Sequence, residues 1–292
     1  MSTLMPWRQG WRRFVLAGIA VVFLSGFGSG ERLFAPSAEL WPRWQANDPT
    51  ATTRIDHRVW SEFLQRYLSR APRGFNQLAY GAVTAGDRQA LDGYIAALAA
   101  QPISRFNRAE QEAYWINLYN ALTVRVVLDY YPVTTIREIN ISPGFFATGP
   151  WGKALVRVEG IDLSLDDIEH RILRPIWRDP RLHYALNCAA ISCPDLQGAA
   201  FLAPDLERQL EQAARQYVND PRGVAVIQGK VIVSKVYDWF IEDFGGSEQT
   251  VLAHLKRYAA PALKAQLKAI NRLDDVRYDW SLNGAPSSAV ID

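Results

Sequence analysis

The spacing of apolar and polar positions divides the chain into helices and short strands. Apolar residues three or four positions apart predict helices over about 59–68, 88–99, 108–130, 204–217, 236–244, 249–258 and 261–270. Short apolar runs around Glu159-Gly160 and Gln228-Gly229-Lys230 predict two β-hairpins, over 155–163 and 224–233. The pattern therefore predicts an α+β fold, a single mostly helical domain with a small β-sheet built from hairpins.

The segment 108–130 is apolar on nearly every side from Ala113 to Leu128, which is typical of a helix in the core. Asn117 and Asn120 interrupt this surface and lie three positions apart on one face. A buried amide needs partners, because leaving it unsatisfied costs about 1–3 kcal/mol. Two interpretations follow: the amides brace neighbouring loops, or they orient a catalytic group or a substrate.

A carboxylate occupies an apolar stripe in the helix expected after Ser164. At 100° per residue, Leu165, Ile168 and Ile172 share one arc, and Glu169 falls inside it. The residues outside the arc are Asp166, Asp167, His170, Arg171 and Arg174. Burying a carboxylate is costly unless it is paired, so Glu169 either ties down the backbone or an arginine, or acts as a general acid or base. Pro175 is expected to end this helix.

The stretch 182–194 holds both cysteines of the chain and one of its four histidines. It begins as an apolar run and continues into small residues, a pattern that predicts a buried central strand followed by a turn. In an extended strand His183 and Cys188 would be about 16 Å apart, at ~3.3 Å per residue. Cys193 could meet His183 instead if the turn folds the chain back.

These residues leave several chemistries open. Cys188 or Cys193 could be a nucleophile, with His183 as its base and Glu169, Asn117 or Asn120 as the orienting group. The cysteines could instead form a disulfide, since a turn can bring their Cα atoms to about 4.4–6.8 Å, or remain as two buried free thiols. The C-x4-C spacing differs from that of thioredoxin-like redox pairs and of common zinc sites. We therefore expect no metal and no cofactor.

The first thirty residues have the layout of a secretory signal, with Arg8, Arg12 and Arg13 before the apolar run 14–25 and small residues at 26–30. We expect a bacterial periplasmic or secreted protein, or one anchored in the inner membrane by this segment if it is not cleaved. Removing three arginines changes the net charge from +2 to −1 (2 − 3), so nucleic-acid binding is not expected. A small molecule or a peptide is the expected ligand.

The expected organisation is a signal peptide over 1–30, an irregular lead-in over 31–58, one domain over 59–280 and a flexible tail over 281–292. Hydrophobic residues make up 49% of the whole chain, which is enough to build a core for this domain.

Four segments together carry a resemblance to a known family. They are Tyr114-Trp115-Ile116-Asn117-Leu118-Tyr119-Asn120-Ala121-Leu122, Leu163-Ser164-Leu165-Asp166-Asp167-Ile168-Glu169-His170, the run from His183 to Pro194, and the run from Asp238 to Phe244. Over roughly 60–258 the chain resembles the DUF547 family, a domain of unknown function found in bacteria and plants. The resemblance implies a single domain, often exported in bacteria, and implies no activity. The recurrent residues of the family map onto Asn117, Asn120, Glu169, His170, His183, Cys188, Cys193 and Pro194.

Two functional hypotheses follow from these residues. The first is a cysteine-dependent hydrolase or acyltransferase that acts on a peptide or envelope substrate, with Cys188 or Cys193, His183, Glu169, Asn117 and Asn120 as candidate catalytic residues. The alternative is a non-catalytic periplasmic binding or structural module with a Cys188–Cys193 disulfide. A common pocket for these groups would favour the first hypothesis.

Overall fold

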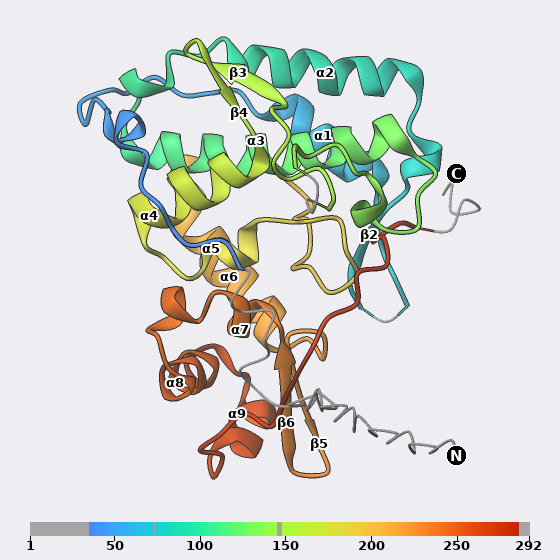
Figure 1. Ribbon diagram of the computed structural model, residues 1–292, viewed down its shortest axis with the longest axis vertical. Coiled ribbons are helices and arrows are strands. Elements are labelled where there is room, and N and C mark those ends of the chain that lie inside the picture. Colours follow the sequence, from blue (N-terminus) through green and yellow to red (C-terminus); the bar gives the residue numbers. More distant parts are fainter. Residues whose placement is uncertain (1–34, 73, 145–147, 286–292) are drawn as a thin grey trace, which may run out of the picture.

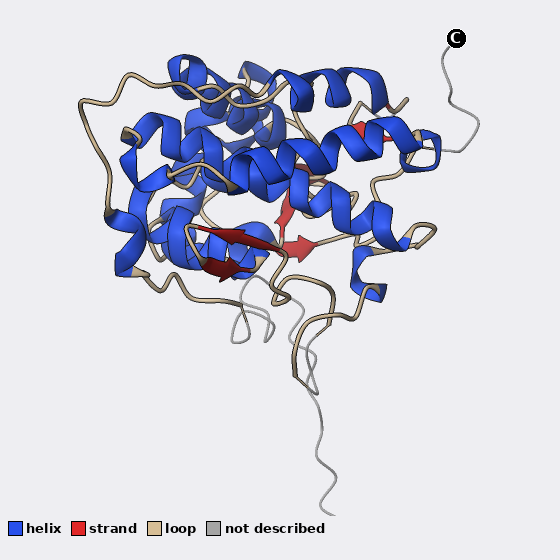
Figure 2. Ribbon diagram, turned by 90° about the horizontal axis from the view of Figure 1, so that it is seen from above, coloured by secondary structure: helices blue, strands red, loops and turns tan. Residues whose placement is uncertain are grey.

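A computed structural model describes residues 35–72, 74–144 and 148–285 (Figure 1). The expected signal peptide therefore lies outside the described residues. The helices are α1 (Arg58–Tyr67), α2 (Ala85–Ala99), α3 (Arg108–Tyr130), α4 (Arg174–Trp177), α5 (Leu182–Ala185), α6 (Leu206–Val218), α7 (Val236–Trp239), α8 (Glu248–Tyr258) and α9 (Pro261–Leu267). The strands are β1 (Leu68–Arg70), β2 (Asn76–Leu78), β3 (Val156–Val158), β4 (Ile161–Leu163), β5 (Val224–Ile227), β6 (Lys230–Ser234) and β7 (Asp275–Arg277). The predicted α+β single-domain fold is confirmed, and Figure 2 shows how far helices dominate it.

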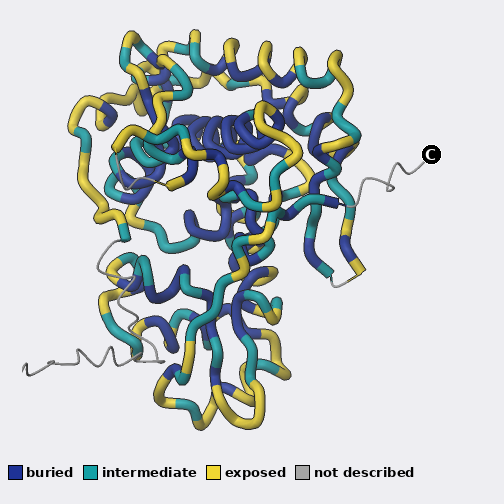
Figure 3. Tube along the Cα trace, turned by 45° about the vertical axis from the view of Figure 1, so that its right-hand side comes forward, coloured by how far each residue is buried: buried dark blue, intermediate teal, exposed yellow. Residues whose placement is uncertain are grey.

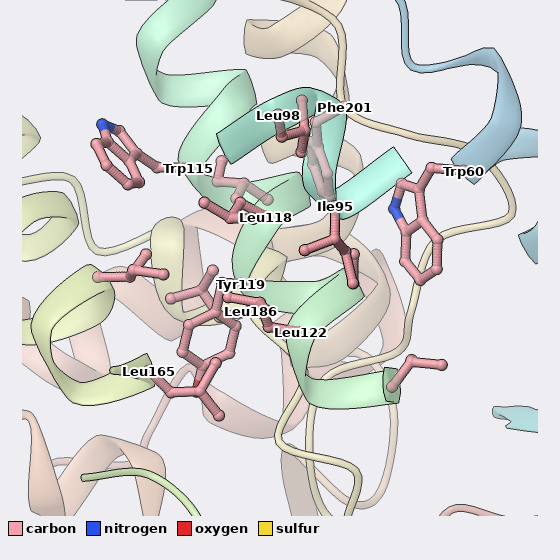
Figure 4. Packing of buried hydrophobic residues seen from close by; sticks show 14 of the residues in the cluster. Trp60, Ile95, Leu98, Trp115, Leu118, Tyr119, Leu122, Leu165, Leu186 and Phe201 are labelled. Carbon is pink, nitrogen blue, oxygen red and sulfur yellow. The ribbon is translucent and has the colours of Figure 1, made fainter. Parts of the chain in front are cut away.

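Helix α3 is the centre of the larger hydrophobic cluster. The Asn107 side chain caps it by accepting from the Glu110 N–H, and every residue from 110 to 124 is buried. The long, almost wholly dark-blue helix in Figure 3 illustrates this burial. Side chains from other segments, including Ile95, Leu165 and Phe201, surround it in Figure 4. The helix predicted over 108–130 is therefore confirmed, including its position in the core.

A second hydrophobic cluster lies in the C-terminal part of the domain, below the α3 layer in Figure 1. It is built from α6, α8 and the sheet β5-β6-β7. Strands β5 and β6 form the predicted antiparallel hairpin, with Val224 opposite Val233. Strand β7 then pairs parallel with β6, a long-range pairing that local patterns do not reveal. None of the helices in the described part of the chain has the length and apolar character needed to cross a membrane.

The prediction of a central strand is wrong. Leu182–Ala185 is the short helix α5, and its C-cap Leu186 has extended backbone. An aspartate begins the turn, because Asp179 Oδ1 accepts from the Arg181 N–H at 2.8 Å. A short buried apolar run is compatible with helix or strand, so hydrophobicity alone could not separate the two.

The segment after Ser164 is helical as predicted, but it is a π-helix, η6 (Asp167–Leu173). The Arg174 N–H donates to the Glu169 carbonyl, five residues back. The prediction that Pro175 ends the helix is wrong. Pro175 lies in the first turn of α4, where a missing N–H is tolerated. A π-helix has more residues per turn than an α-helix, so the spacing of 100° per residue does not apply here. That spacing predicted His170 outside the buried face, but His170 is buried.

Two further expectations need correction. The helix predicted over 236–244 divides at Phe240 into α7 and the 3-10 turn η8 (Ile241–Phe244). The tail expected to be flexible is anchored over 281–285: Leu282 forms a bridge with Ala190, and Gly284 forms one with Leu78. Asn283 is buried as well. Residues 286–292 lie outside the described part of the chain.

Candidate active site

A pocket of about 630 Å³ lies between the two hydrophobic clusters. Two sets of side chains line it. The first set carries the titratable groups, and we call it the polar group: Tyr119, Asp166, Glu169, His170 and His183. The second set, the aromatic cluster, consists of Trp151, Trp239, Tyr278 and Trp280. The convergence of Glu169 and His183 on one pocket was expected from the sequence if the protein is an enzyme.

Glu169 lies at the centre of the polar group. Its Oε1 is 3.9 Å from Nδ1 of His183 and 3.9 Å from Nδ1 of His170. Tyr119, from α3, interacts with the same carboxylate, and burial together with the Glu169 charge raises the Tyr119 pKa well above its ordinary value. Tyr119 is therefore a neutral hydroxyl that can donate to Glu169. The 3.9 Å separations exceed hydrogen-bond length.

His183 is held by a carboxylate from the C-terminal part of the chain. Its Nε2–H donates to Asp243 Oδ2 at 2.7 Å, and Arg174 Nε donates to the same oxygen at 2.6 Å. Burial alone would raise the Asp243 pKa, but the hydrogen bonds from His183 and Arg174 lower it to about 2. The imidazole also stacks on Phe240, with ring centres 4.4 Å apart. With Nε2 engaged, Nδ1 of His183 is the nitrogen that faces Glu169.

His170 has a defined tautomer. Arg174 Nη1 lies 2.9 Å from His170 Nδ1, and because a guanidinium only donates, Nδ1 must accept. The proton of the neutral ring is therefore on Nε2, 3.7 Å from Asp166 Oδ1. Burial lowers the His170 pKa to about 4, so the ring is neutral at physiological pH.

Asp166 is the second carboxyl group of the pocket. Burial, followed by the nearby charges of Glu169 and Asp167, raises its pKa to about 7. With a pKa near 7, Asp166 can donate a proton at neutral pH. Glu169 and Asp166 thus form a pair of interacting carboxyls, of the kind in which one group acts as acid and the other as base.

The aromatic cluster is continuous. Tyr278 lies 4.8 Å from Trp239 and 4.7 Å from Trp280, measured between ring centres, and Trp151 meets Trp280 edge-on at 5.7 Å. Arg137 lines the pocket too, with its guanidinium over the Trp280 ring at 5.4 Å. The pocket therefore offers flat apolar faces beside its titratable groups.

Cys188 and Cys193 form a disulfide, with Cα atoms 5.9 Å apart. This is one of the alternatives that the sequence left open. Cys188 lines the pocket, and both sulfurs contact the Tyr278 hydroxyl. The hydrogen-bond partner of His183 is Asp243. The structure therefore does not bring His183 and a free thiol together as a nucleophile and its base, because both sulfurs are in the disulfide.

Asn117 and Asn120 brace loops, which is the simpler of the two interpretations. Asn117 bonds both backbone groups of Phe201, donating to its oxygen at 2.8 Å and accepting from its N–H at 3.0 Å. Asn120 donates to the Ala185 oxygen at 2.8 Å and accepts from the Asn187 N–H at 2.8 Å. Neither amide lines the pocket, so neither belongs among the candidate catalytic residues.

Several pocket residues were not identified from the sequence. Asp243 and the residues Trp239, Tyr278 and Trp280 come from segments more than fifty residues after His183. One available signal was the presence of acidic residues, Asp238, Glu242 and Asp243, in the aromatic-rich run 236–244. Another was the alternation Tyr278-Asp279-Trp280, which places two aromatics on one side of an extended chain. In the described part of the chain, no cluster of three or more His, Cys, Asp or Glu residues could hold a metal ion.

Residues 103–218 match the family model described as "Protein of unknown function, DUF547". Residues 103–218 form a DUF547 segment. The match is shorter than the resemblance expected over 60–258; it includes the polar group and both cysteines but not Asp243. Searches of curated proteins and of solved structures found no match.

Proposed function

We propose that this protein is a hydrolase or transferase that uses acid–base catalysis by carboxyl groups on a saccharide-type substrate. The observation that carries the proposal is the position of Glu169, which lies in the pocket 3.9 Å from both imidazoles and influences the pKa of Asp166. Two neighbouring carboxyls, one acting as acid and the other as base or nucleophile, are the machinery of many glycosidases. Asp166 would protonate the leaving group, and Glu169 would act as the base or nucleophile.

The histidines support the chemistry by placing nitrogen atoms that carry no proton beside Glu169. His183 donates through Nε2 to Asp243, so its Nδ1 can take or return a proton on the Glu169 side. Arg174 contacts both Asp243 and His170, and it is only 4% exposed, which fixes the position of both rings. Such positioning is what acid–base catalysis requires.

The aromatic cluster supports the saccharide assignment. Sugar rings carry polar hydroxyls at their edges and an apolar C–H face, which packs on flat aromatic rings. Trp239 and Trp280 offer such faces in the same pocket as the two carboxyls. Arg137, at the Trp280 ring, would pair with an acidic group on the substrate.

The test is a comparison of Glu169→Gln and Asp166→Asn with the wild-type protein on defined oligosaccharides, cell-wall glycan fragments and short peptides, with products identified by mass spectrometry. We expect glycan cleavage by the wild type and a loss of about 100-fold or more in either variant. Asp162→Asn is the control, because Asp162 is an exposed acid on β4 outside the pocket. It should retain full activity.

Two outcomes would refute the proposal. If the wild-type protein cleaves none of the glycans, the saccharide assignment is wrong. If peptides are cleaved only after reduction, and cleavage is lost in Cys188→Ser but kept in Glu169→Gln, the thiol mechanism expected from the sequence replaces the carboxyl mechanism.

We also propose that the protein works outside the cytoplasm, as the arrangement of basic, apolar and small residues over 1–30 indicates. A disulfide between Cys188 and Cys193 is typical of oxidising compartments. Fractionation of cells that express the full chain, with N-terminal sequencing of the product, tests this. A cytoplasmic product that begins at Met1 would contradict it.

A further inference from the structure

The two cysteines differ in their access to the pocket. Cys188 is partly exposed and lines the pocket, whereas Cys193 is 1% exposed. A reagent that enters the pocket can therefore reach the Cys188 sulfur first. One accessible and one buried sulfur is the arrangement needed for directed thiol–disulfide exchange, in which the attacked sulfur and the leaving sulfur have separate roles.

The buried sulfur is surrounded by hydrogen-bond donors. Cys193 Sγ lies 3.0 Å from the Cys188 nitrogen, 3.4 Å from the Ala190 nitrogen and 3.2 Å from the Tyr278 hydroxyl oxygen. The backbone donors converge because Ala189, between them, has a positive φ of 59°. The Asn187 side chain accepts from the Ala189 N–H at 2.9 Å and supports this conformation.

A donor-rich environment of this kind matters most for a charged sulfur. Converging backbone N–H groups around a left-handed residue form a cradle for anions. A neutral disulfide sulfur is a weak acceptor, whereas a thiolate is strongly stabilised by N–H and O–H donors. The surroundings of Cys193 therefore match the reduced, ionised form better than the oxidised form.

We propose that the Cys188–Cys193 pair is a reversible thiol–disulfide exchange site, entered through the pocket by a low-molecular-weight thiol. This assignment does not rest on the proposed hydrolase activity, because its chemistry takes place at the sulfurs alone. It adds a redox function to a pocket whose other groups exchange protons.

The exchange proceeds in two balanced steps. The thiolate of the small thiol attacks Cys188 Sγ, a new S–S bond forms, and the Cys188–Cys193 bond breaks with Cys193 leaving as a thiolate. A second thiol molecule then attacks the sulfur of the small thiol in the mixed disulfide. This step releases the oxidised small-molecule disulfide, and a proton from solvent completes the Cys188 thiol. Two thiols are oxidised and one protein disulfide is reduced.

The first experiment treats the folded wild-type protein with glutathione buffers of defined ratio and counts thiols by alkylation and mass spectrometry. We expect reversible reduction under native conditions, with the fold retained by circular dichroism. Reduction that occurs only after unfolding in urea would contradict the proposal, because the disulfide would then be a buried staple rather than an exchange site.

Single cysteine variants test the direction of attack. With oxidised glutathione, Cys193→Ser should form a mixed disulfide at Cys188 in the folded state. Cys188→Ser should react much more slowly, since Cys193 is buried. Equal rates in the two variants would overturn the assignment of Cys188 as the attacked sulfur.

Tyr278→Phe tests the stabilisation of the thiolates, because it removes only the hydroxyl, which lies 3.2 Å from Cys193 Sγ and 3.0 Å from Cys188 Sγ. We expect reduction by glutathione to become about tenfold slower, as a hydrogen bond to a charged group predicts. Tyr130→Phe is the control, since Tyr130 is 47% exposed at the end of α3, and its rate should not change. The ultraviolet absorbance of the thiolate in reduced wild-type protein should titrate below the ordinary cysteine pKa of about 8.5. An ordinary or higher pKa, with no effect of Tyr278→Phe, would show that the donors do not stabilise a thiolate.

Discussion

The polar group and the aromatic cluster share one pocket but come from different parts of the chain. All five residues of the polar group lie within 103–218, the segment that matches the DUF547 model. Three of the four aromatic residues, Trp239, Tyr278 and Trp280, follow that segment. The titratable side chains come from α3, from η6 and its N-cap Asp166, and from α5. Trp239 ends α7, and Tyr278 and Trp280 directly follow β7. We infer that the matched segment supplies the chemistry and that the C-terminal part of the chain supplies most of the recognition.

Asp243 is the exception that joins the two parts. It comes from η8, after the matched segment, and bonds both Arg174 and His183 on the other side. The polar group would therefore lose its orientation without the C-terminal part. Substitutions on either side of this contact separate the contribution of the matched segment from that of the C-terminal part.

Asp243→Ala should have the largest effect on stability. It leaves the buried Arg174 guanidinium without its carboxylate, and removing one partner of a buried pair costs about 3–5 kcal/mol. Urea denaturation measures the free energy of unfolding. The control is Glu211→Ala, which breaks an exposed Arg215–Glu211 pair and should cost less than about 1 kcal/mol. Equal costs for the two variants would mean that Asp243 does not join the two parts.

Glu112→Gln tests whether burial raises carboxyl pKa values on the α3 side, as it does for Asp166. Burial, with the charges of Asp179 and Glu207, raises the Glu112 pKa from 4.5 to about 8. The folded state therefore binds a proton that the unfolded state has already released, and stability falls as pH rises between these values. Gln has no such cost.

The Glu112→Gln variant should match the wild type near pH 5 and exceed it by roughly 3 kcal/mol near pH 8. Urea titrations at both pH values measure the difference. Glu62→Gln, at an exposed position on α1, should show no such change with pH. If the free energies of unfolding of Glu112→Gln and the wild type change with pH in parallel, burial does not raise the Glu112 pKa.

Asn120→Ala should reduce stability less than Asp243→Ala does, but its structural effect should extend to the pocket. It leaves the Ala185 oxygen and the Asn187 N–H without their partner, a loss of about 2 kcal/mol. It should also loosen the turn that holds the disulfide, which amide hydrogen exchange would detect at Cys188. Asn117→Ala is the matched control: a similar loss of stability is expected, with the exchange confined to the segment around Phe201.

Trp280→Ala should have the smallest effect, and its effect should be on binding. Removing one aromatic face should raise KM for a glycan about tenfold and leave kcat nearly unchanged. Trp177→Ala is the control, because Trp177 packs against Arg108 away from the pocket. A fall in kcat with unchanged KM would mean that the aromatic cluster takes part in the chemistry rather than in recognition.

The elements that the sequence predicted well are those with strong local patterns. The bounds of α3, the hairpin β5-β6 and the unusual position of Glu169 all follow from spacing within one segment. His183 was identified as a candidate, although the strand expected to carry it is a helix. Asn117 and Asn120 were recognised as buried amides, but only their partners in distant loops show that they are braces.

The remaining features depend on distant contacts or on departures from regular geometry. A regular 100° spacing excluded His170, because a π-helix turns through a smaller angle per residue. The pairing of β7 with β6 brings Tyr278 and Trp280 to the pocket across more than forty residues of sequence. The role of Asp243 depends on Arg174 and His183, sixty or more residues away, so no local pattern could assign it.

The most direct test is a carbon-13 NMR titration of the aspartate side-chain carboxyls in the folded protein, with Asp166→Asn used to assign the signal. The proposed function requires a carboxyl that remains partly protonated at neutral pH, and this measurement needs no substrate. We predict that the Asp166 signal titrates with a pKa of about 7 and that the value falls in Glu169→Gln, which removes a neighbouring charge. An Asp166 pKa near the ordinary value of about 3.9, unchanged in Glu169→Gln, would contradict the carboxyl pair at the centre of this account.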